Sequence, residues 1–138
     1  CGIMGQGGTQ MSARVLIVDD EKRLAYSLAQ TLQLDFPECR VDMAYSGEEA
    51  LSSLASNTYD LIIADVRMPG VSGMELIKGV RYLDAEVPII IMTGYGSASL
   101  RREAVTLGVD HYIDKPFDID DLILRVSQLL PSEEESDG

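Results

Sequence analysis

The 138-residue sequence contains no tryptophan, one histidine and two cysteines. Two cysteines, Cys1 and Cys39, are too few for a disulfide framework, and they lack the spacing of a metal site. The longest uninterrupted apolar runs are four residues long, whereas a membrane-spanning helix needs about 20 residues and a signal-peptide core about 7–15. These absences exclude a disulfide-stabilised scaffold, and we expect a reduced, cytoplasmic protein that does not associate with membranes.

Basic residues are also scarce. Lys and Arg number 11 against 23 Asp and Glu, which gives a formal net charge of −12. Because binding to a nucleic-acid backbone requires clustered Lys and Arg, we expect no direct contact with DNA or RNA. The sequence is 46% hydrophobic and 25% charged, which is typical of a soluble globular domain, and its length suits one domain.

The two ends of the sequence differ from its body. Residues 1–12 are rich in glycine and show no periodicity, so we interpret them as a cloning remnant or a disordered N-terminus. Residues 131–138 are acidic and are either a natural tail or a truncated linker. The folded domain is therefore expected to span residues 13–130.

Short apolar runs alternate with segments of helical periodicity in the body of the chain. The runs are Val15–Val18, Val41–Ala44, Leu61–Ala64, Ile89–Met92 and His111–Ile113. Two central runs show no polar alternation, as expected of strands covered on both faces. Five strands alternating with five helices predict an α/β fold, a doubly wound (βα)5 three-layer sandwich around a parallel five-stranded sheet. The run Val41–Ala44 does alternate at its start, which suits an edge strand.

Polar residues follow four of the predicted strands directly. They are Asp19, Asp20 and Glu21, then Asp65, then Thr93 and Gly94, and finally Asp114, Lys115 and Pro116. Each set alone is ordinary helix-cap, turn or loop chemistry. In a parallel sheet, however, the carboxyl ends of all strands meet at one edge, so three carboxylates, a hydroxyl and an ammonium group are expected to converge there.

Clustered carboxylates need a cation, and oxygen ligands without His or Cys favour Mg²⁺. An aspartate beside Mg²⁺, Lys115 and Thr93 is equipped to accept a phosphoryl group as an aspartyl phosphate. Lys115 and the metal would neutralise the phosphoryl oxygens, while Thr93 and nearby backbone N–H groups would donate hydrogen bonds to them.

Four motifs in order resemble the response-regulator receiver domain of two-component signalling. They are Val15–Glu21 with its acidic pair, Asp65–Gly70, Met92–Gly94 and Lys115–Phe117, at separations usual for the family. The resemblance covers about residues 13–130. It implies a CheY-like domain whose strands have the flavodoxin-like order 2-1-3-4-5, and it identifies residues 13–130 as a receiver domain.

The resemblance also implies a metal site and a phosphoacceptor. Asp65 would take the phosphoryl group from a phosphohistidine of a sensor histidine kinase or a phosphotransfer protein. Asp20 and Asp65 would bind Mg²⁺ directly, Asp19 would bind it through water, and Arg67 would bind it through its backbone carbonyl. Lys115 would pair with the phosphoryl group.

The implied output is a conformational switch. Thr93 would move toward the phosphoryl group, with Gly94 in the same binding site, and Tyr112 would swing inward behind Thr93. The face formed by the fourth helix, fifth strand and fifth helix would then change shape. An output domain, a partner or a second copy of the chain would bind this face. Such a protein assists its own phosphotransfer and autodephosphorylation but is not an enzyme.

Two alternative functions were weighed against this switch. One is an interaction module on the same fold that works without phosphorylation, which the intact set of site residues disfavours. The other is a Mg²⁺-dependent phosphatase with an aspartate nucleophile, but Asp19-Asp20-Glu21-Lys22 does not match its D-x-D motif. The motifs look most like those of receivers attached to transcriptional activators.

Arg101 and Arg102 depart from the family pattern, which often has small or apolar residues in the fourth helix. They are either two solvated arginines or a contact for an acidic partner or a second copy.

Overall fold

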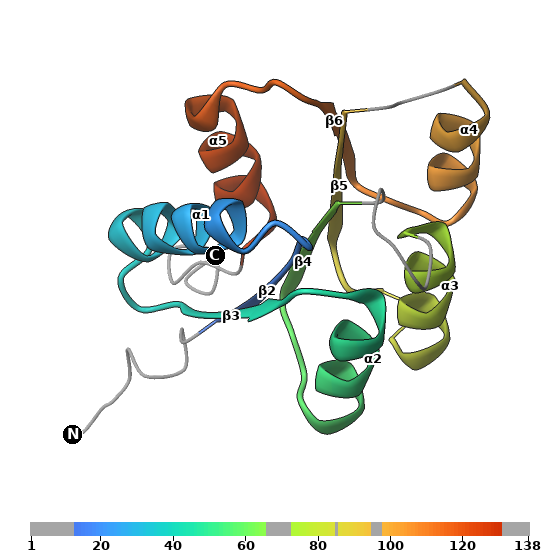
Figure 1. The fold of residues 1–138 in the computed structure, drawn as a ribbon, viewed down its shortest axis with the longest axis horizontal. Helices are drawn as coiled ribbons and strands as arrows, with labels where there is room; N and C mark the ends of the chain where they lie inside the picture. The colour runs from blue at the N-terminus through green and yellow to red at the C-terminus, as the bar shows by residue number, and fades with distance from the viewer. Residues whose placement is uncertain (1–12, 66–72, 85, 95–97, 131–138) are drawn as a thin grey trace, which may run out of the picture.

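The computed structural model describes residues 13–65, 73–84, 86–94 and 98–130, shown in colour in Figure 1. Arg67 and the end of the motif Asp65–Gly70 lie outside these ranges. The described residues form the strands β2 (Arg14–Val18), β3 (Arg40–Ala44), β4 (Leu61–Asp65), β5 (Ile89–Thr93) and β6 (His111–Asp114). They also form the helices α1 (Lys22–Asp35), α2 (Gly47–Ser56), α3 (Gly73–Leu83), α4 (Ala98–Thr106) and α5 (Ile119–Leu129).

The strands make one parallel sheet in the order β3-β2-β4-β5-β6. Counted along the chain, this is the predicted order 2-1-3-4-5, and β3 is an edge strand as expected. Figure 1 shows α1 and α5 on one face of the sheet and α2, α3 and α4 on the other. The predicted three-layer α/β fold is therefore confirmed.

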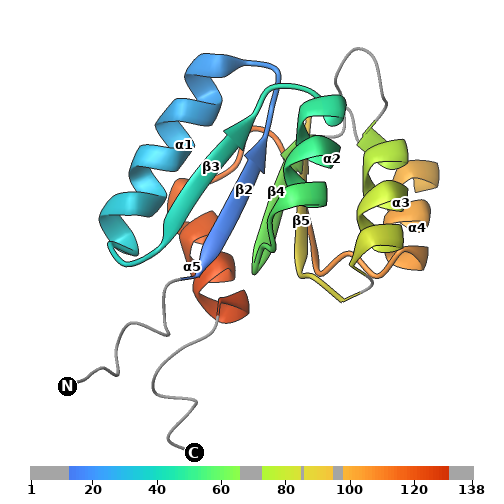
Figure 2. The same cartoon turned by 90° about the horizontal axis from the view of Figure 1, so that it is seen from below.

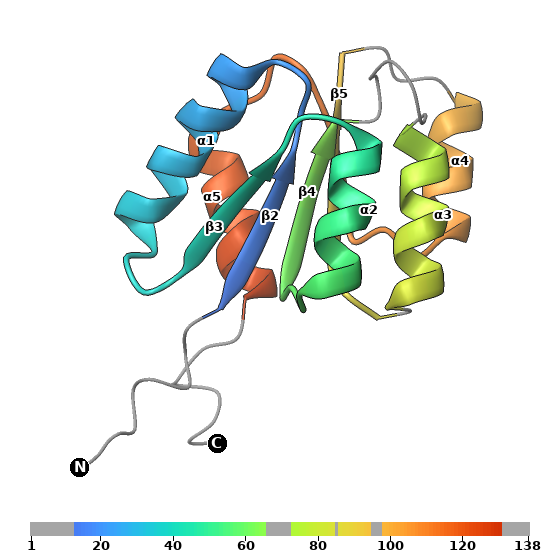
Figure 3. The same cartoon turned by 60° about the horizontal axis from the view of Figure 1, so that its bottom comes forward.

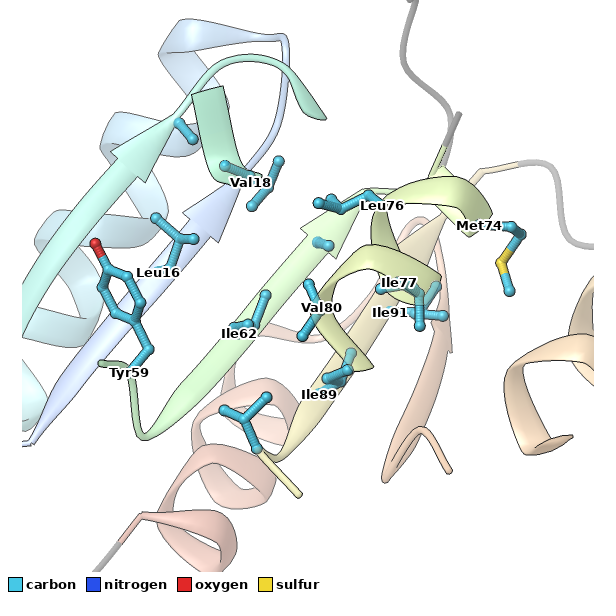
Figure 4. Packing of buried hydrophobic residues seen from close by; sticks show 14 of the residues in the cluster. Leu16, Val18, Tyr59, Ile62, Met74, Leu76, Ile77, Val80, Ile89 and Ile91 are labelled. Carbon is cyan, nitrogen blue, oxygen red and sulfur yellow. The ribbon is translucent and has the colours of Figure 1, made fainter. Parts of the chain in front are cut away.

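The core explains why the central runs show no polar alternation. Leu16, Ile62 and Ile91 pack toward α2, α3 and α4 (Figure 4), while the residues next to them, such as Ile17 and Ile63, pack toward α1 and α5. All of these side chains are inaccessible to solvent. Because both faces of these strands are covered, every strand position there needs an apolar side chain.

The strands run slightly further than the apolar runs predicted. Asp65 and Thr93 are the last residues of β4 and β5 rather than the first residues after them. Asp65 pairs with Met92, and Thr93 pairs with Asp114. Backbone pairing does not depend on side-chain polarity, so the ladder continues to these polar residues.

Local capping residues set several helix ends. The Ser46 side chain accepts a hydrogen bond from the Glu49 N–H at 3.1 Å, and Asp118 accepts one from Asp120 at 2.9 Å. Gly108, just beyond α4, has a φ of 75°, a left-handed conformation that favours glycine.

Arg81 of α3 attaches the end of α4 to the rest of the domain. Its guanidinium donates to the carbonyl oxygens of Leu107, Val87 and Gly108 at 2.7, 2.8 and 2.9 Å. The two helices lie side by side (Figure 2). Arg81 thereby satisfies the carbonyls of Leu107 and Gly108 just beyond the end of α4, and the carbonyl of Val87 shortly before β5.

Among the described helices, none combines the length and the apolar composition needed to cross a membrane.

Candidate functional site

The carboxyl ends of the strands meet at one edge of the sheet (Figure 3). Asp19 follows β2, and its N–H donates to the Ala44 carbonyl at 3.0 Å, which continues the pairing of β2 with β3. Asp65 ends β4. Carboxylate oxygens of Asp19, Asp20 and Asp65 all lie within 4.8 Å of one another. The predicted convergence of three carboxylates is confirmed.

Lys115 brings its ammonium group into this acidic cluster. Its Nζ lies 3.0 Å from Asp65 Oδ2 and 3.6 Å from Asp19 Oδ2. The Lys115 N–H donates to the Thr93 carbonyl at 2.8 Å, which fixes the start of the loop after β6 against the end of β5. The structure thus places the predicted cation directly beside the predicted phosphoacceptor.

Burial differs among the members of the cluster. Asp19, Asp65 and Thr93 are buried, Lys115 is half-buried, and Asp20 and Gly94 are exposed. The cluster therefore combines buried carboxylates with members that solvent can reach.

The electrostatics of Asp19 show an excess of negative charge. Burial raises the pKa of Asp19, and the charges of Asp65 and Glu21 raise it further. The Glu21 N–H, which donates to Asp19 Oδ1 at 2.9 Å, and the Lys115 ammonium lower it without cancelling that rise. A single ammonium group does not balance three carboxylates.

The pKa of Lys115 is also raised, which for a lysine favours the charged form. Burial lowers its pKa, but the hydrogen bond to Asp65 and the charges of Asp19 and Asp65 outweigh burial and raise it. Lys115 therefore stays protonated at neutral pH and supplies a fixed positive charge.

The cluster has the donor chemistry of a magnesium site. Asp19 Oδ2 is buried and accepts no hydrogen bond from the described residues, so it has an unused acceptor for a cation. The three carboxylates supply hard oxygen ligands, without His or Cys among the grouped residues, which suits Mg²⁺. The predicted carbonyl ligand from Arg67 lies outside the described residues and stays a prediction.

Tyr112, the predicted switch residue, is half-buried on β6. It packs against the apolar cluster under α2, α3 and α4. The guanidinium carbon of Arg101 lies 4.3 Å from the centroid of its ring. The sequence pattern does not indicate this contact, because α4 and β6 are separate elements.

The fold and this edge of the sheet define a class of signalling domain. The family model of the response regulator receiver domain matches residues 15–127 of this chain. The chain belongs to this family, and it is a receiver domain of two-component signalling.

Relatives and solved structures agree with this assignment. The response regulator MprA of Mycobacterium tuberculosis is 36% identical over 120 residues, which make up 87% of this chain and 51% of MprA. The uncharacterised transcriptional regulatory protein YkoG of Bacillus subtilis is 33% identical over 116 residues, 84% of this chain and 50% of YkoG. The chain thus spans about half the length of these curated relatives.

Among solved structures, a CheY-like receiver domain protein of Methanospirillum hungatei superposes with a TM-score of 0.83 at 29% identity. The match covers 92% of this chain and 99% of that one. The response regulator TrrA of Thermotoga maritima, solved in complex with Mg²⁺-BeF, has a TM-score of 0.75 at 36% identity, covering 86% of this chain and 99% of TrrA.

Proposed function

We propose that this receiver domain is a phosphorylation-activated switch in which Asp65 accepts a phosphoryl group with the help of Mg²⁺. The donor is a phosphohistidine of a sensor histidine kinase or a phosphotransfer protein. The observation that carries the proposal is the contact of Lys115 Nζ with Asp65 Oδ2 at 3.0 Å, inside a cluster of three carboxylates.

Each residue has a distinct part in the transfer. An Asp65 carboxylate oxygen forms a bond to phosphorus as the phosphorus–nitrogen bond of the phosphohistidine breaks, and the imidazole leaves with the bonding electrons. Lys115 moves its charge from the carboxylate to the phosphoryl oxygens, where negative charge is concentrated. Bound Mg²⁺ would neutralise those oxygens further, and Asp19, Asp20 and Asp65, with the Arg67 carbonyl, would hold it.

Thr93 and Gly94 lie beside Lys115 and the proposed phosphoacceptor Asp65. Thr93 ends β5 next to Lys115, with its carbonyl holding the Lys115 N–H at 2.8 Å. Its hydroxyl is the proposed donor to the phosphoryl group, and Gly94 leaves the opening free of a side chain. The domain assists its own phosphotransfer and autodephosphorylation but is not a classical enzyme.

The proposed output is a change in the face formed by α4, β6 and α5. This face includes Tyr112, the proposed partner of Thr93 in the switch. An output domain, a separate partner or a second copy of the chain would bind it. Because the curated relatives are about twice as long, we infer that a full-length protein would join residues 13–130 to an output region such as a transcriptional activator. The proposed location is the cytoplasm.

Intact-mass measurement tests the phosphoacceptor. The chain is incubated with acetyl phosphate and Mg²⁺, alongside Asp65→Asn and the exposed control Asp35→Asn. Wild type and Asp35→Asn should each gain one phosphoryl group, and EDTA should prevent the gain. No added mass in wild type would favour the alternative, a phosphorylation-independent interaction module. Equal phosphorylation of Asp65→Asn would refute the site assignment.

A further inference from the structure

Arg101 of α4 contacts two residues of β6. Its guanidinium lies 3.2 Å from Asp114 Oδ2 and stacks over the ring of Tyr112, 4.3 Å from the centroid. The sequence pattern does not predict these contacts within the chain, and the Arg101 side chain remains 53% exposed. The neighbouring Arg102 is exposed.

These two contacts fall on the strand that leads directly to Lys115, the proposed partner of the phosphoryl group. Asp114 immediately precedes Lys115, whose Nζ is 3.0 Å from Asp65. Asp114 also pairs with Thr93 across the sheet, and Tyr112 pairs with Ile91. A shift of Lys115 or Thr93 toward a phosphoryl group therefore acts on the residues that Arg101 holds.

The contacts that Arg81 and Arg101 make around α4 differ in strength. Just beyond its carboxyl end, Arg81 donates to the carbonyls of Leu107 and Gly108 at 2.7 and 2.9 Å. Nearer its amino end, the ion pair of Arg101 and Asp114 has side chains 53% and 61% exposed. Exposed ion pairs and cation–π contacts are weak, so the contacts of Arg101 with β6 are easier to break than the hydrogen bonds of Arg81.

We propose that Arg101 is a positioning residue of the phosphorylation switch, which fastens α4 to β6 by its contacts with Tyr112 and Asp114. This inference rests on the proposed function of Asp65. Arg101 favours the arrangement in which Tyr112 lies beneath its guanidinium, and it opposes any rearrangement of β6 and α4 that phosphorylation requires. The strength of these contacts sets how much free energy phosphorylation must supply to rearrange β6 and α4.

Beryllofluoride with Mg²⁺, a phosphoryl analogue, provides the test. Its half-saturating concentration is measured from backbone amide and tyrosine ring NMR shifts in wild type, Arg101→Ala, Arg101→Lys, Asp114→Asn and the control Arg102→Ala. Removing an exposed ion pair together with a cation–π contact should lower this concentration about 3- to 10-fold in Arg101→Ala. Asp114→Asn should lower it less, because the ring contact remains.

The controls separate positioning from general structural damage. Arg101→Lys keeps the charge and should restore most of the wild-type value, and Arg102→Ala should match wild type. In Arg101→Ala the ring resonances of Tyr112 should shift before any ligand is added, because the guanidinium no longer covers the ring. If Arg101→Ala does not fold, the half-saturating concentration of Asp114→Asn is compared instead with those of Arg101→Lys and wild type.

The outcomes also distinguish this inference from the proposed function. A half-saturating concentration in Arg101→Ala that equals that of Arg102→Ala, or exceeds that of wild type, would overturn the positioning role while leaving Asp65 as phosphoacceptor. Failure of wild type to bind beryllofluoride, or equal binding by Asp65→Asn, would overturn both.

Discussion

Replacing Asp19 by asparagine should make the domain more stable while removing a ligand of its proposed metal. The Asp19 side chain has no exposed surface, and its Oδ2 accepts no hydrogen bond from the described residues. Burial is the largest cause of its raised pKa, so its negative charge is disfavoured in the folded state. Asparagine has nearly the same size and shape but carries no charge.

The size of the effect follows from three opposing contributions. The substitution removes the cost of burying a charge, the repulsion from Asp65, and the attraction to Lys115 Nζ at 3.6 Å. Lys115 keeps its shorter contact with Asp65 at 3.0 Å, so no buried cation is left unpaired. We expect a net gain of about 1–2 kcal/mol in the free energy of unfolding at pH 7, or a rise in Tm of about 3–8 °C.

The difference in stability between wild type and Asp19→Asn changes with pH in a definite direction. Between the ordinary aspartate pKa of about 3.9 and the raised pKa of Asp19 in the folded state, the folded protein binds more protons than the unfolded chain. Wild-type stability therefore falls relative to Asp19→Asn as pH rises through this interval. The two proteins should be similar near pH 4 and should separate toward neutral pH.

Urea denaturation followed by circular dichroism checks this prediction, with Asp35→Asn as the exposed control. In EDTA at pH 7, Asp19→Asn should be the most stable protein. Mg²⁺ at ten times its Kd should stabilise wild type by about 1.4 kcal/mol and Asp19→Asn by much less. If Asp19→Asn is less stable than wild type in EDTA, or gains as much from Mg²⁺, then the burial argument for this site is wrong.

Three further substitutions test other parts of the structure. Arg81→Ala leaves three carbonyl groups without their charged donor, so we expect a loss of about 2–4 kcal/mol in urea denaturation; a loss below about 0.5 kcal/mol would show that water replaces the arginine. Burial would raise the pKa of Asp42, but hydrogen bonds from Tyr59 and Arg14 outweigh burial and lower it. Asp42→Asn should therefore cost about 1 kcal/mol at pH 7. This deficit should shrink as pH falls below about 3.9, where wild type loses the same contribution; a deficit constant from pH 7 to pH 2 would contradict the assignment. Ser46→Ala removes the cap of α2 and should cost about 1 kcal/mol, measured by thermal unfolding, whereas Ser46→Asp should retain most of the stability.

The fold could be predicted because the central strands β2, β4 and β5 are buried on both faces. A run such as Ile89–Met92, with no polar residue, is stable in few settings other than the middle of a parallel sheet. The strand β6 was the least clearly indicated by the sequence, because His111 and Tyr112 are only half-buried and its apolar run is short. The site could also be anticipated, because once the strands are parallel their polar ends must meet at one edge.

The contacts made by arginines could not be predicted in the same way. Arg81 reaches carbonyl groups 26 and 27 positions away in sequence, and any backbone carbonyl is an equivalent acceptor. No side-chain type at Leu107 or Gly108 indicates which arginine will bind there. The sequence likewise offers Arg101 a choice among 23 Asp and Glu residues, and only the packing of α4 on β6 selects Asp114.

The contrast between Asp42 and Asp19 shows where the domain gives up stability. Both are aspartates at the sheet, but Asp42 Oδ2 accepts hydrogen bonds from Arg14 at 2.9 Å and Tyr59 at 2.7 Å, and its pKa is lowered. Asp19 is more deeply buried, and Lys115, shared with Asp65, is the cation beside it. A fold selected for stability alone would supply a second donor at Asp19. The missing donor leaves a carboxylate oxygen for a cation, so a carboxylate whose charge is disfavoured by burial is one that the proposed function requires.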